Sequence, residues 1–270
     1  MTPIAMELSG GARSEARLFE APAARSALLV VPAMGVDARK YDAFGEALAA
    51  LGVTTLVSEL RGGESSSVKP RRGVDYGYED LLGDTVTHLR WLREKSGVPT
   101  HVLGHSLGGQ ISVAGVSRWH EPGAKVIVVG SGTVHFRAYE GFEKWRVLAG
   151  TQFAGVISRV LGFFPGDKLG FGGVQGKKLI VDWAHASRTG TFRLEHELEK
   201  FAPHVLAIHV KGDTFAPRRS TERLVSKLVN AQVSWADVEP PAEPKRQDPH
   251  FRWMKEPRAV AQAAARFLGT

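Results

Sequence analysis

The feature that most restricts the fold of this sequence is an alternation between short apolar runs and longer stretches with helical spacing. The runs are rich in β-branched residues, and the longer stretches place apolar residues three and four positions apart. This pattern predicts an α/β protein with a mainly parallel sheet, because each crossover between parallel strands needs a helix. The expected strands are 4–8, 16–20, 26–31, 53–60, 100–103, 125–129, 205–210 and 232–238. The expected helices are 41–51, 79–94, 107–119, 220–229 and 256–268.

One stretch interrupts the alternation. From about 133 to 200 the sequence shows no clean strand–helix unit and is rich in glycine and aromatic residues. Such an interruption is most simply an insertion over one edge of the sheet. Two independent domains are the alternative, but the strand pattern returns after the interruption. We therefore expect a core of residues 1–131 plus 201–270 and a lid insertion at 132–200.

Composition excludes several classes of protein. The 270 residues include no cysteine, which excludes disulfide scaffolds, Cys–zinc sites, iron–sulfur clusters and a cysteine nucleophile. The net charge is +7, but the basic residues are scattered, and the densest group is Lys69-Pro70-Arg71-Arg72. Without a run of about five like charges, the pattern favours a solvated basic surface over a nucleic-acid site.

The sequence also lacks the usual signals for export or membrane insertion. Its first residues show no basic region followed by an apolar stretch. No window approaches the roughly 18 uninterrupted apolar residues of a membrane-spanning helix. These observations predict a cytoplasmic protein without a membrane span.

The most informative motif is Gly104-His105-Ser106-Leu107-Gly108, a Gly-x-Ser-x-Gly pattern. It follows an apolar strand and precedes a helix of small residues, which is the setting of a nucleophile elbow. In this turn Ser106 projects above the sheet, and Gly104 and Gly108 leave room for the neighbouring backbone. A glycine-rich turn without chemistry is the alternative.

A nucleophilic serine needs a base, and the base needs an orienting acid. His250 is the last histidine of the chain and the only one after Asp213. Asp213 follows the expected strand 205–210, where open parallel sheets place their sites. Asp248 is the alternative acid, although a residue two positions from the histidine is poorly placed to orient its ring. His105 is expected to point into the core.

The sequence resembles the α/β-hydrolase superfamily in its serine-hydrolase branch. More closely, it is similar to bacterial predicted α/β-hydrolases with a serine-aminopeptidase-like core. The resemblance covers nearly the whole chain apart from the expected lid. The segments that carry it are Pro32-Ala33-Met34-Gly35, Tyr41-Asp42, Arg61-Gly62-Gly63-Glu64-Ser65, 104–109, 212–217 and Pro249-His250. It implies the fold and the triad order of serine, acid and histidine, and it implies no particular substrate.

An oxyanion hole needs two backbone donors. One is expected to be the amide of Leu107, directly after the nucleophile. The other is expected from the loop 32–37, where many relatives carry His-Gly and this chain carries Pro32-Ala33. Counting back from Tyr41 places Met34 at the donor position of the family.

Other residues have more ordinary interpretations. Arg61 resembles a loop arginine of relatives, and we expect it to tie loops together rather than contact substrate. The glycine-flanked aromatics of the expected lid, Phe163, Phe164 and Phe171, suit a mobile apolar wall, with Phe171 a candidate for substrate contact. The alternative is that they only pack the lid onto the core. Phosphate-loop, dinucleotide and zinc patterns are incomplete, so no cofactor and no metal are expected.

These observations predict a serine hydrolase that cleaves a carboxylic ester, less favourably an amide, bearing an apolar group. Ser106, Asp213 and His250 form the catalytic triad, and the amides of Met34 and Leu107 hold the oxyanion. The expected partner is a small acyl substrate, and the sequence does not indicate an oligomeric state. An acyltransferase, a cofactor-free perhydrolase using the same triad, and a non-catalytic binding module are the alternatives.

Overall fold

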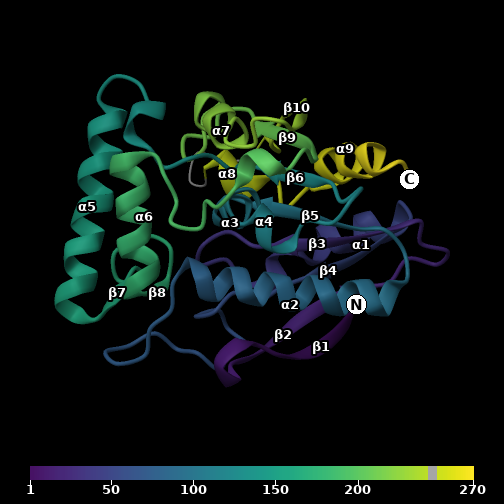
Figure 1. Ribbon diagram of the computed structural model, residues 1–270, viewed down its shortest axis with the longest axis horizontal. Coiled ribbons are helices and arrows are strands. Elements are labelled where there is room, and N and C mark those ends of the chain that lie inside the picture. Colours follow the sequence, from purple (N-terminus) through teal and green to yellow (C-terminus); the bar gives the residue numbers. More distant parts are fainter. Residues whose placement is uncertain (243–247) are drawn as a thin grey trace.

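The computed structural model describes residues 1–242 and 248–270, and its centre is an eight-stranded sheet (Figure 1). The strands are β1 Thr2–Glu7, β2 Arg13–Phe19, β3 Ser26–Val31, β4 Val53–Val57, β5 Thr100–His105, β6 Val126–Val129, β9 His204–Val210 and β10 Gln232–Val238. Their order is β1-β2-β4-β3-β5-β6-β9-β10. β1 and β2 pair antiparallel, as do β2 and β4, and all other neighbours are parallel. The expected mainly parallel sheet is confirmed.

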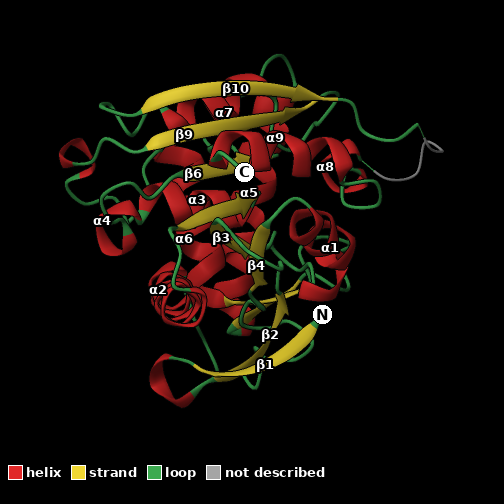
Figure 2. Ribbon diagram, turned by 90° about the vertical axis from the view of Figure 1, so that its right-hand side faces the viewer, coloured by secondary structure: helices red, strands yellow, loops and turns green. Residues whose placement is uncertain are grey.

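Helices cover both faces of this sheet. They are α1 Asp42–Ala50, α2 Tyr78–Ser96, α3 Leu107–Ala114, α4 Val116–Trp119, α7 Arg218–Val225, α8 Pro249–Arg252 and α9 Arg258–Leu268. The buried side chains of α1 and α9 join the apolar core on one face, and those of α2, α3, α4 and α7 join the core on the other. Figure 2 shows α1 and α2 on opposite sides of the sheet.

The middle of the sheet explains why its strands read as continuous apolar runs. Every residue of β3, β4, β5 and β6 is buried, because helices exclude water from both faces. In the core on the side of α1 and α9, the ring of Trp253 packs edge to face against the rings of Tyr41 and Phe44. The loops that follow these four strands therefore begin from a fully buried part of the sheet.

Several observed boundaries differ from the expected ones by a few residues, and three of the differences concern the elements around the site. β4 ends at Val57 rather than at 60, because its pairing with β2 ends there. The expected helix 107–119 is divided at Gly115, where a Cβ atom would lie 2.5 Å from a methyl carbon of Leu82 on α2. The expected helix 220–229 is observed as α7, which begins at Arg218 and ends at Val225.

The chain between β6 and β9 adds no strand to the central sheet. This β6–β9 segment, residues 130–203, forms α5 Glu143–Leu161, a hairpin of β7 Phe163–Pro165 and β8 Val174–Gly176, and α6 Lys177–Thr189. Figure 1 shows α5 and α6 side by side, outside the sheet. The hydroxyls of Thr151 and Ser187 join the two helices at 2.8 Å. Short 3₁₀ turns occur at Ser9–Gly11, Ala38–Tyr41, Phe136–Ala138 and Leu198–Lys200.

Candidate active site

Ser106 occupies the sharp turn between β5 and α3. Its φ of 54° and ψ of −114° are unusual for a residue with a side chain, and such strained conformations occur at functional turns. A Cβ atom on Gly104 would lie 2.3 Å from the carbonyl carbon of Gly108, and one on Gly108 would lie 2.0 Å from the carbonyl oxygen of Val31. Glycine at both positions therefore lets the turn close against its neighbours.

His250 and Asp213 meet in the loops beyond the carboxyl ends of the strands. The Nδ1 atom of His250 lies 2.8 Å from the Oδ2 atom of Asp213, and both side chains are buried. The other carboxylate oxygen accepts the amides of Phe215 and Ala216, each at 2.8 Å. Because an ionised carboxylate only accepts, Nδ1 carries the ring proton and Nε2 is left with its lone pair. This is the arrangement of a histidine prepared to act as a base.

Ser106 and His250 line the same cavity, which has a volume of about 420 Å³. Among the residues that the structure describes, the hydroxyl of Ser106 forms no hydrogen bond with His250. Catalytic hydrogen bonds are often long or poorly aligned without substrate and tighten in the complex. The structure thus brings the three predicted triad residues to one site, with the acid–histidine contact already formed.

The predicted oxyanion donors also lie at this cavity. Met34 and Leu107 both line it, and neither amide donates a hydrogen bond within the described ranges. Leu107 is the first residue of α3, whose N–H has no partner inside the helix. The neighbouring amide of Ala33 is already bonded to the Tyr41 hydroxyl at 2.9 Å. Of the neighbouring residues Ala33 and Met34, it is therefore Met34 whose amide has no partner in the described ranges.

A close backbone contact supports the loop that carries Met34. Gly35 has a φ of +68°, and a Cβ atom there would lie 2.4 Å from the carbonyl carbon and oxygen of Gly172. On the opposite side, a Cβ on Gly172 would lie 3.0 Å from the sulfur of Met34. The backbone of the loop 32–37 therefore lies directly against the backbone of the β7–β8 hairpin, with no side chain between them.

A buried chain of hydrogen bonds that the sequence did not predict connects the parts of the site. The Tyr41 hydroxyl lies 2.8 Å from Nδ1 of His105, and Nε2 of His105 lies 3.0 Å from the carbonyl oxygen of His250. Burial raises the pKa of Tyr41, and burial followed by the charge of His250 lowers the pKa of His105 far below its ordinary value. Tyr41 thus donates to a neutral His105, which donates to the carbonyl of His250. The expectation that His105 points into the core agrees with its complete burial.

The cavity is mainly apolar, and the β6–β9 segment provides much of its wall. Phe171 lines it and stacks between Trp183 and Phe215, at ring-centre distances of 5.6 and 6.0 Å. Phe164 also lines it, whereas Phe163 does not. Polar side chains at the wall are already paired within the protein, because Gln110 bonds Tyr78 and the Gly132 carbonyl, and Tyr139 bonds the Phe215 carbonyl.

Asp248, the alternative acid, contacts a different part of His250. Its Oδ1 atom accepts the backbone amide of His250 at 2.9 Å and so caps the start of α8. Its Oδ2 atom accepts the hydroxyl of Thr214. Asp213 therefore contacts the ring of His250, and Asp248 holds its backbone.

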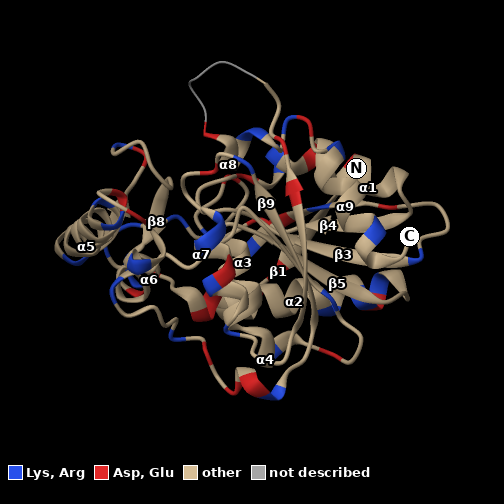
Figure 3. Ribbon diagram, turned by 90° about the horizontal axis from the view of Figure 1, so that it is seen from above, with Lys and Arg blue, Asp and Glu red and all other residues tan. Residues whose placement is uncertain are grey.

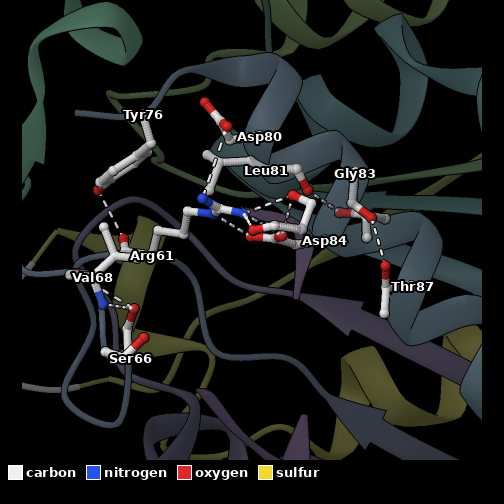
Figure 4. A network of polar contacts seen from close by, with 12 residues as sticks. Arg61, Ser66, Val68, Tyr76, Asp80, Leu81, Gly83, Asp84 and Thr87 are labelled. Carbon is white, nitrogen blue, oxygen red and sulfur yellow. Dashed lines mark hydrogen bonds and ion pairs between the residues drawn. The ribbon is translucent and has the colours of Figure 1, made fainter. Parts of the chain in front are cut away.

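Arg61 does not line the cavity. Figure 4 shows its guanidinium facing Asp84 of α2, with Nε–Oδ2 and Nη2–Oδ1 distances of 2.7 and 2.8 Å. The same Nη2 atom donates to the carbonyl oxygen of Ser9 at 2.9 Å. The Tyr76 hydroxyl donates to the Arg61 carbonyl. These contacts join the turn between β1 and β2, the loop after β4, and α2, which is the loop-tying position expected from the sequence.

The parallel sheet, its helices on both faces and the strained serine turn after β5 define the α/β-hydrolase fold. The comparisons assign the family. Residues 22–162 match the family model described as serine aminopeptidase, S33 (Hydrolase_4), and the chain belongs to this family of hydrolases. Both the fold and the resemblance expected from the sequence are confirmed.

Solved structures show the same fold along nearly the whole chain. A soluble variant of monoglyceride lipase from Saccharomyces cerevisiae is 13% identical, with a TM-score of 0.75, covering 99% of this chain and 95% of that one. A hydrolase from Pseudomonas aeruginosa is 19% identical, with a TM-score of 0.61 and coverages of 100% and 99%. A monoacylglycerol lipase from Paleococcus ferrophilus is 17% identical, with a TM-score of 0.59 and coverages of 94% and 97%. No curated protein sequence matches this chain.

Proposed function

We propose that this protein is a serine hydrolase that cleaves a carboxylic ester with an apolar group through an acyl-enzyme. The observation that carries the proposal is the Asp213–His250 contact at 2.8 Å, with His250 and Ser106 on the wall of one apolar cavity. Packing of the fold alone does not explain why a strained serine, a buried acid–histidine pair and two amides without a partner in the described ranges all lie at one cavity.

The reaction follows from the positions of these groups. The Ser106 oxygen attacks the ester carbonyl while Nε2 of His250 takes its proton, and Asp213 stabilises the resulting imidazolium. The amides of Met34 and Leu107 bind the oxyanion. The intermediate collapses when the alkoxide leaves with the proton from His250. Water then attacks the acyl-enzyme and gives a proton to His250. When this second intermediate collapses, the acid is released and His250 returns the proton to the Ser106 oxygen.

The choice of an ester rests on two arguments. An alkoxide leaves more easily than an amine, so an ester makes fewer demands on the site. The wall of the cavity is mainly apolar and its polar side chains are largely paired, which suits an apolar acyl or alcohol group. Two similar structures are a monoglyceride lipase and a monoacylglycerol lipase, which supports the same choice.

We further propose that residues 132–200 act as a lid on a core of residues 1–131 plus 201–270. The position of α5 and α6 outside the central sheet supports this division (Figure 1). Phe153, Phe164 and Phe171 of this region all line the cavity. In this arrangement the core carries out the chemistry and the lid selects the chain length.

The first prediction tests the nucleophile. Replacing Ser106 with alanine removes one hydroxyl, so we expect an unchanged fold and a loss of turnover on the order of 10⁶-fold. The measurement is hydrolysis of a panel of nitrophenyl esters, together with labelling of wild type and variant by a fluorophosphonate probe. Full activity in the Ser106→Ala variant would refute the assignment. A wild type that neither reacts with the probe nor turns over esters would identify a binding module instead.

A further inference from the structure

The outward face of α5 carries an apolar stripe that the described chain leaves largely exposed; only Trp145 has a ring contact, with Phe136 at 6.0 Å. The helix buries Thr151, Ala154 and Ser158 on one face. On the opposite face, apolar residues recur every three or four positions, so they share one side of the helix. This outer stripe consists of Phe142, just before the helix, and Trp145, Ala149, Phe153, Val156 and Val160.

The exposure of these side chains is unusual. Phe142, Phe153 and Val160 are 77%, 62% and 66% exposed, and Trp145 and Val156 are 54% and 56% exposed. An apolar face this regular is normally packed against a core. Outside the outer stripe, the rest of α5 and the cavity wall, the exposed large apolar residues of the described ranges occur singly, at Met1, Leu51 and Val229. Isolated exposed residues are ordinary on a protein surface, but a continuous patch marks an interaction site.

Basic residues frame the outer stripe. With 100° per residue, Arg146 and Arg159 lie on its two sides. The ammonium of Lys144 lies 5.2 Å from the ring centre of Trp145, and Arg72 donates to the Val160 carbonyl at the end of the helix. Figure 3 shows α5 at the outer edge of the molecule with basic residues along it. Aromatic residues flanked by lysine and arginine are typical of helices that lie in the interface of an anionic membrane.

Charge favours an anionic surface as the occupant. Arg146 pairs with Glu143 at 2.6 Å, whereas Lys144 and Arg159 form no ion pair with any residue that the structure describes. An anionic lipid surface supplies the opposite charge to these two cations.

The outer stripe adjoins the mouth of the cavity. Phe153 of the stripe and Leu169 of the following loop are both exposed, and both line the cavity. Arg146 lines it as well. A surface that covers the stripe therefore also lies against this side of the cavity. An apolar ester could pass from that surface into the cavity without crossing water.

We propose that the outer stripe of α5 docks on an anionic lipid surface and holds the cavity mouth against it. The docking itself does not depend on the proposed reaction, whereas the supply of an ester from the surface rests on the proposed function. No helix of the described ranges is long and apolar enough to cross a bilayer.

The test is flotation of the full chain with vesicles of phosphatidylcholine, with and without phosphatidylglycerol. We expect binding to the anionic vesicles, weakened by added salt. The double variant Trp145→Gln/Val156→Gln removes two stripe residues that do not line the cavity, and its binding should fall roughly tenfold or more. Val229→Gln, an equally exposed apolar residue outside the β6–β9 segment, is the control and should bind like wild type.

Two further measurements separate the outcomes. Hydrolysis of a short, water-soluble ester should be equal in wild type and double variant, which tests the reaction independently of the docking. Light scattering reports the oligomeric state of both proteins. The proposal is overturned if wild type does not bind anionic vesicles, or if the double variant binds them equally well. A wild-type dimer that the double variant converts to a monomer would show instead that the stripe joins two copies.

Discussion

Two aspartates near His250 have separate tasks. Asp213 contacts the ring of His250, and Asp248 accepts its backbone amide. We predict that Asp213→Asn lowers turnover by about 10⁴-fold, because an amide in that place favours the wrong tautomer of the ring. Asp248→Asn should have a small effect, since asparagine also caps helices well. Ester hydrolysis by both variants checks the ranking, and a larger loss in the Asp248 variant would mean that the acid is misassigned.

Tyr41 joins the loop of Met34 to the histidines of the site. In a Tyr41→Phe variant, the buried amide of Ala33 and Nδ1 of His105 lose their partner. We predict a loss of about 1–3 kcal/mol of stability for each group left unpaired, together with lower turnover.

Tyr76→Phe is the matched control. Tyr76 does not line the cavity, and its buried hydroxyl lies 2.7 Å from both the Arg61 carbonyl oxygen and the side-chain oxygen of Gln175, between which its one proton is shared. The Tyr76→Phe variant should lose a comparable amount of stability in urea unfolding but retain its turnover. Equal turnover in both variants would show that the Tyr41 chain supports the fold and not the site.

At the scale of single residues, the sequence predicted the three residues that the structure brings to one site better than it predicted the residues that position them. Ser106 is predicted from its motif, and His250 is predicted because no other histidine follows Asp213. The hydrogen bonds through Tyr41 and His105 were not found. A buried tyrosine and a buried histidine have no distinctive spacing, and their partnership depends on three loops that meet only in the folded chain.

Among the elements, the strands of the central sheet were the easiest to predict. Burial on both faces leaves a continuous apolar run, which is clear even in a short segment. Helices α5 and α6 were missed. In α5, apolar residues lie on the buried face and on the outer stripe, and Gly150 and Gly155 interrupt the helix-forming sequence. The resulting pattern has no single apolar side, so it does not have the periodicity of an amphipathic helix.

The wall that α5 and the β7–β8 hairpin form should set the preference for chain length. Each substrate methylene that enters the cavity should contribute about 0.8 kcal/mol, close to fourfold in kcat/KM. Replacing Phe171 with alanine should flatten this dependence for long acyl chains and leave acetyl esters nearly unchanged. A uniform loss at every length would show that Phe171 supports only the fold.

Gly150 offers the opposite change in the same cavity. It lines the cavity in the middle of α5, and a Cβ atom there would meet nothing within 4 Å. Gly150→Leu should therefore fill the cavity and reduce kcat/KM for long esters selectively. Gly150→Ala is the control, and it should stabilise the helix by about 0.5–1 kcal/mol with little change in preference. An unchanged profile in the leucine variant would place the acyl chain elsewhere.

For the molecule as a whole, buried titratable groups should make the fold sensitive to acid. Burial lowers the pKa of His88 and of His105, and lowers that of His101 to about 4. Below about pH 6.5 the unfolded chain binds protons at these histidines while the folded chain does not, so the free energy of unfolding falls. Glu59 acts in the opposite direction, because burial raises its pKa to about 7. Burial also lowers the pKa of His120 and of His135, and it raises the pKa of Asp182. Five histidines therefore act against two carboxylates, and we expect the histidines to dominate.

Urea unfolding at about pH 7.5 and about pH 5 measures this prediction. Between its unfolded and folded pKa values, Glu59 binds a proton in the folded chain and offsets part of the loss. The variant Glu59→Gln should therefore lose stability more steeply with acid than wild type. Stability that rises toward pH 5 in wild type would contradict the assignment of neutral, buried histidines.

The contact between Gly35 and Gly172 restricts how this enzyme could be recombined with its relatives. Exchanging residues 132–200 for the corresponding piece of another family member would also exchange the backbone against which the loop of Met34 rests. A residue larger than glycine at position 35 would meet the backbone of Gly172 and force the two loops apart, and the φ of +70° at Gly172 disfavours a larger residue there. A chimera made to alter selectivity would thus displace the loop of Met34, the residue that we propose as an oxyanion donor, unless the incoming piece also placed a glycine opposite Gly35.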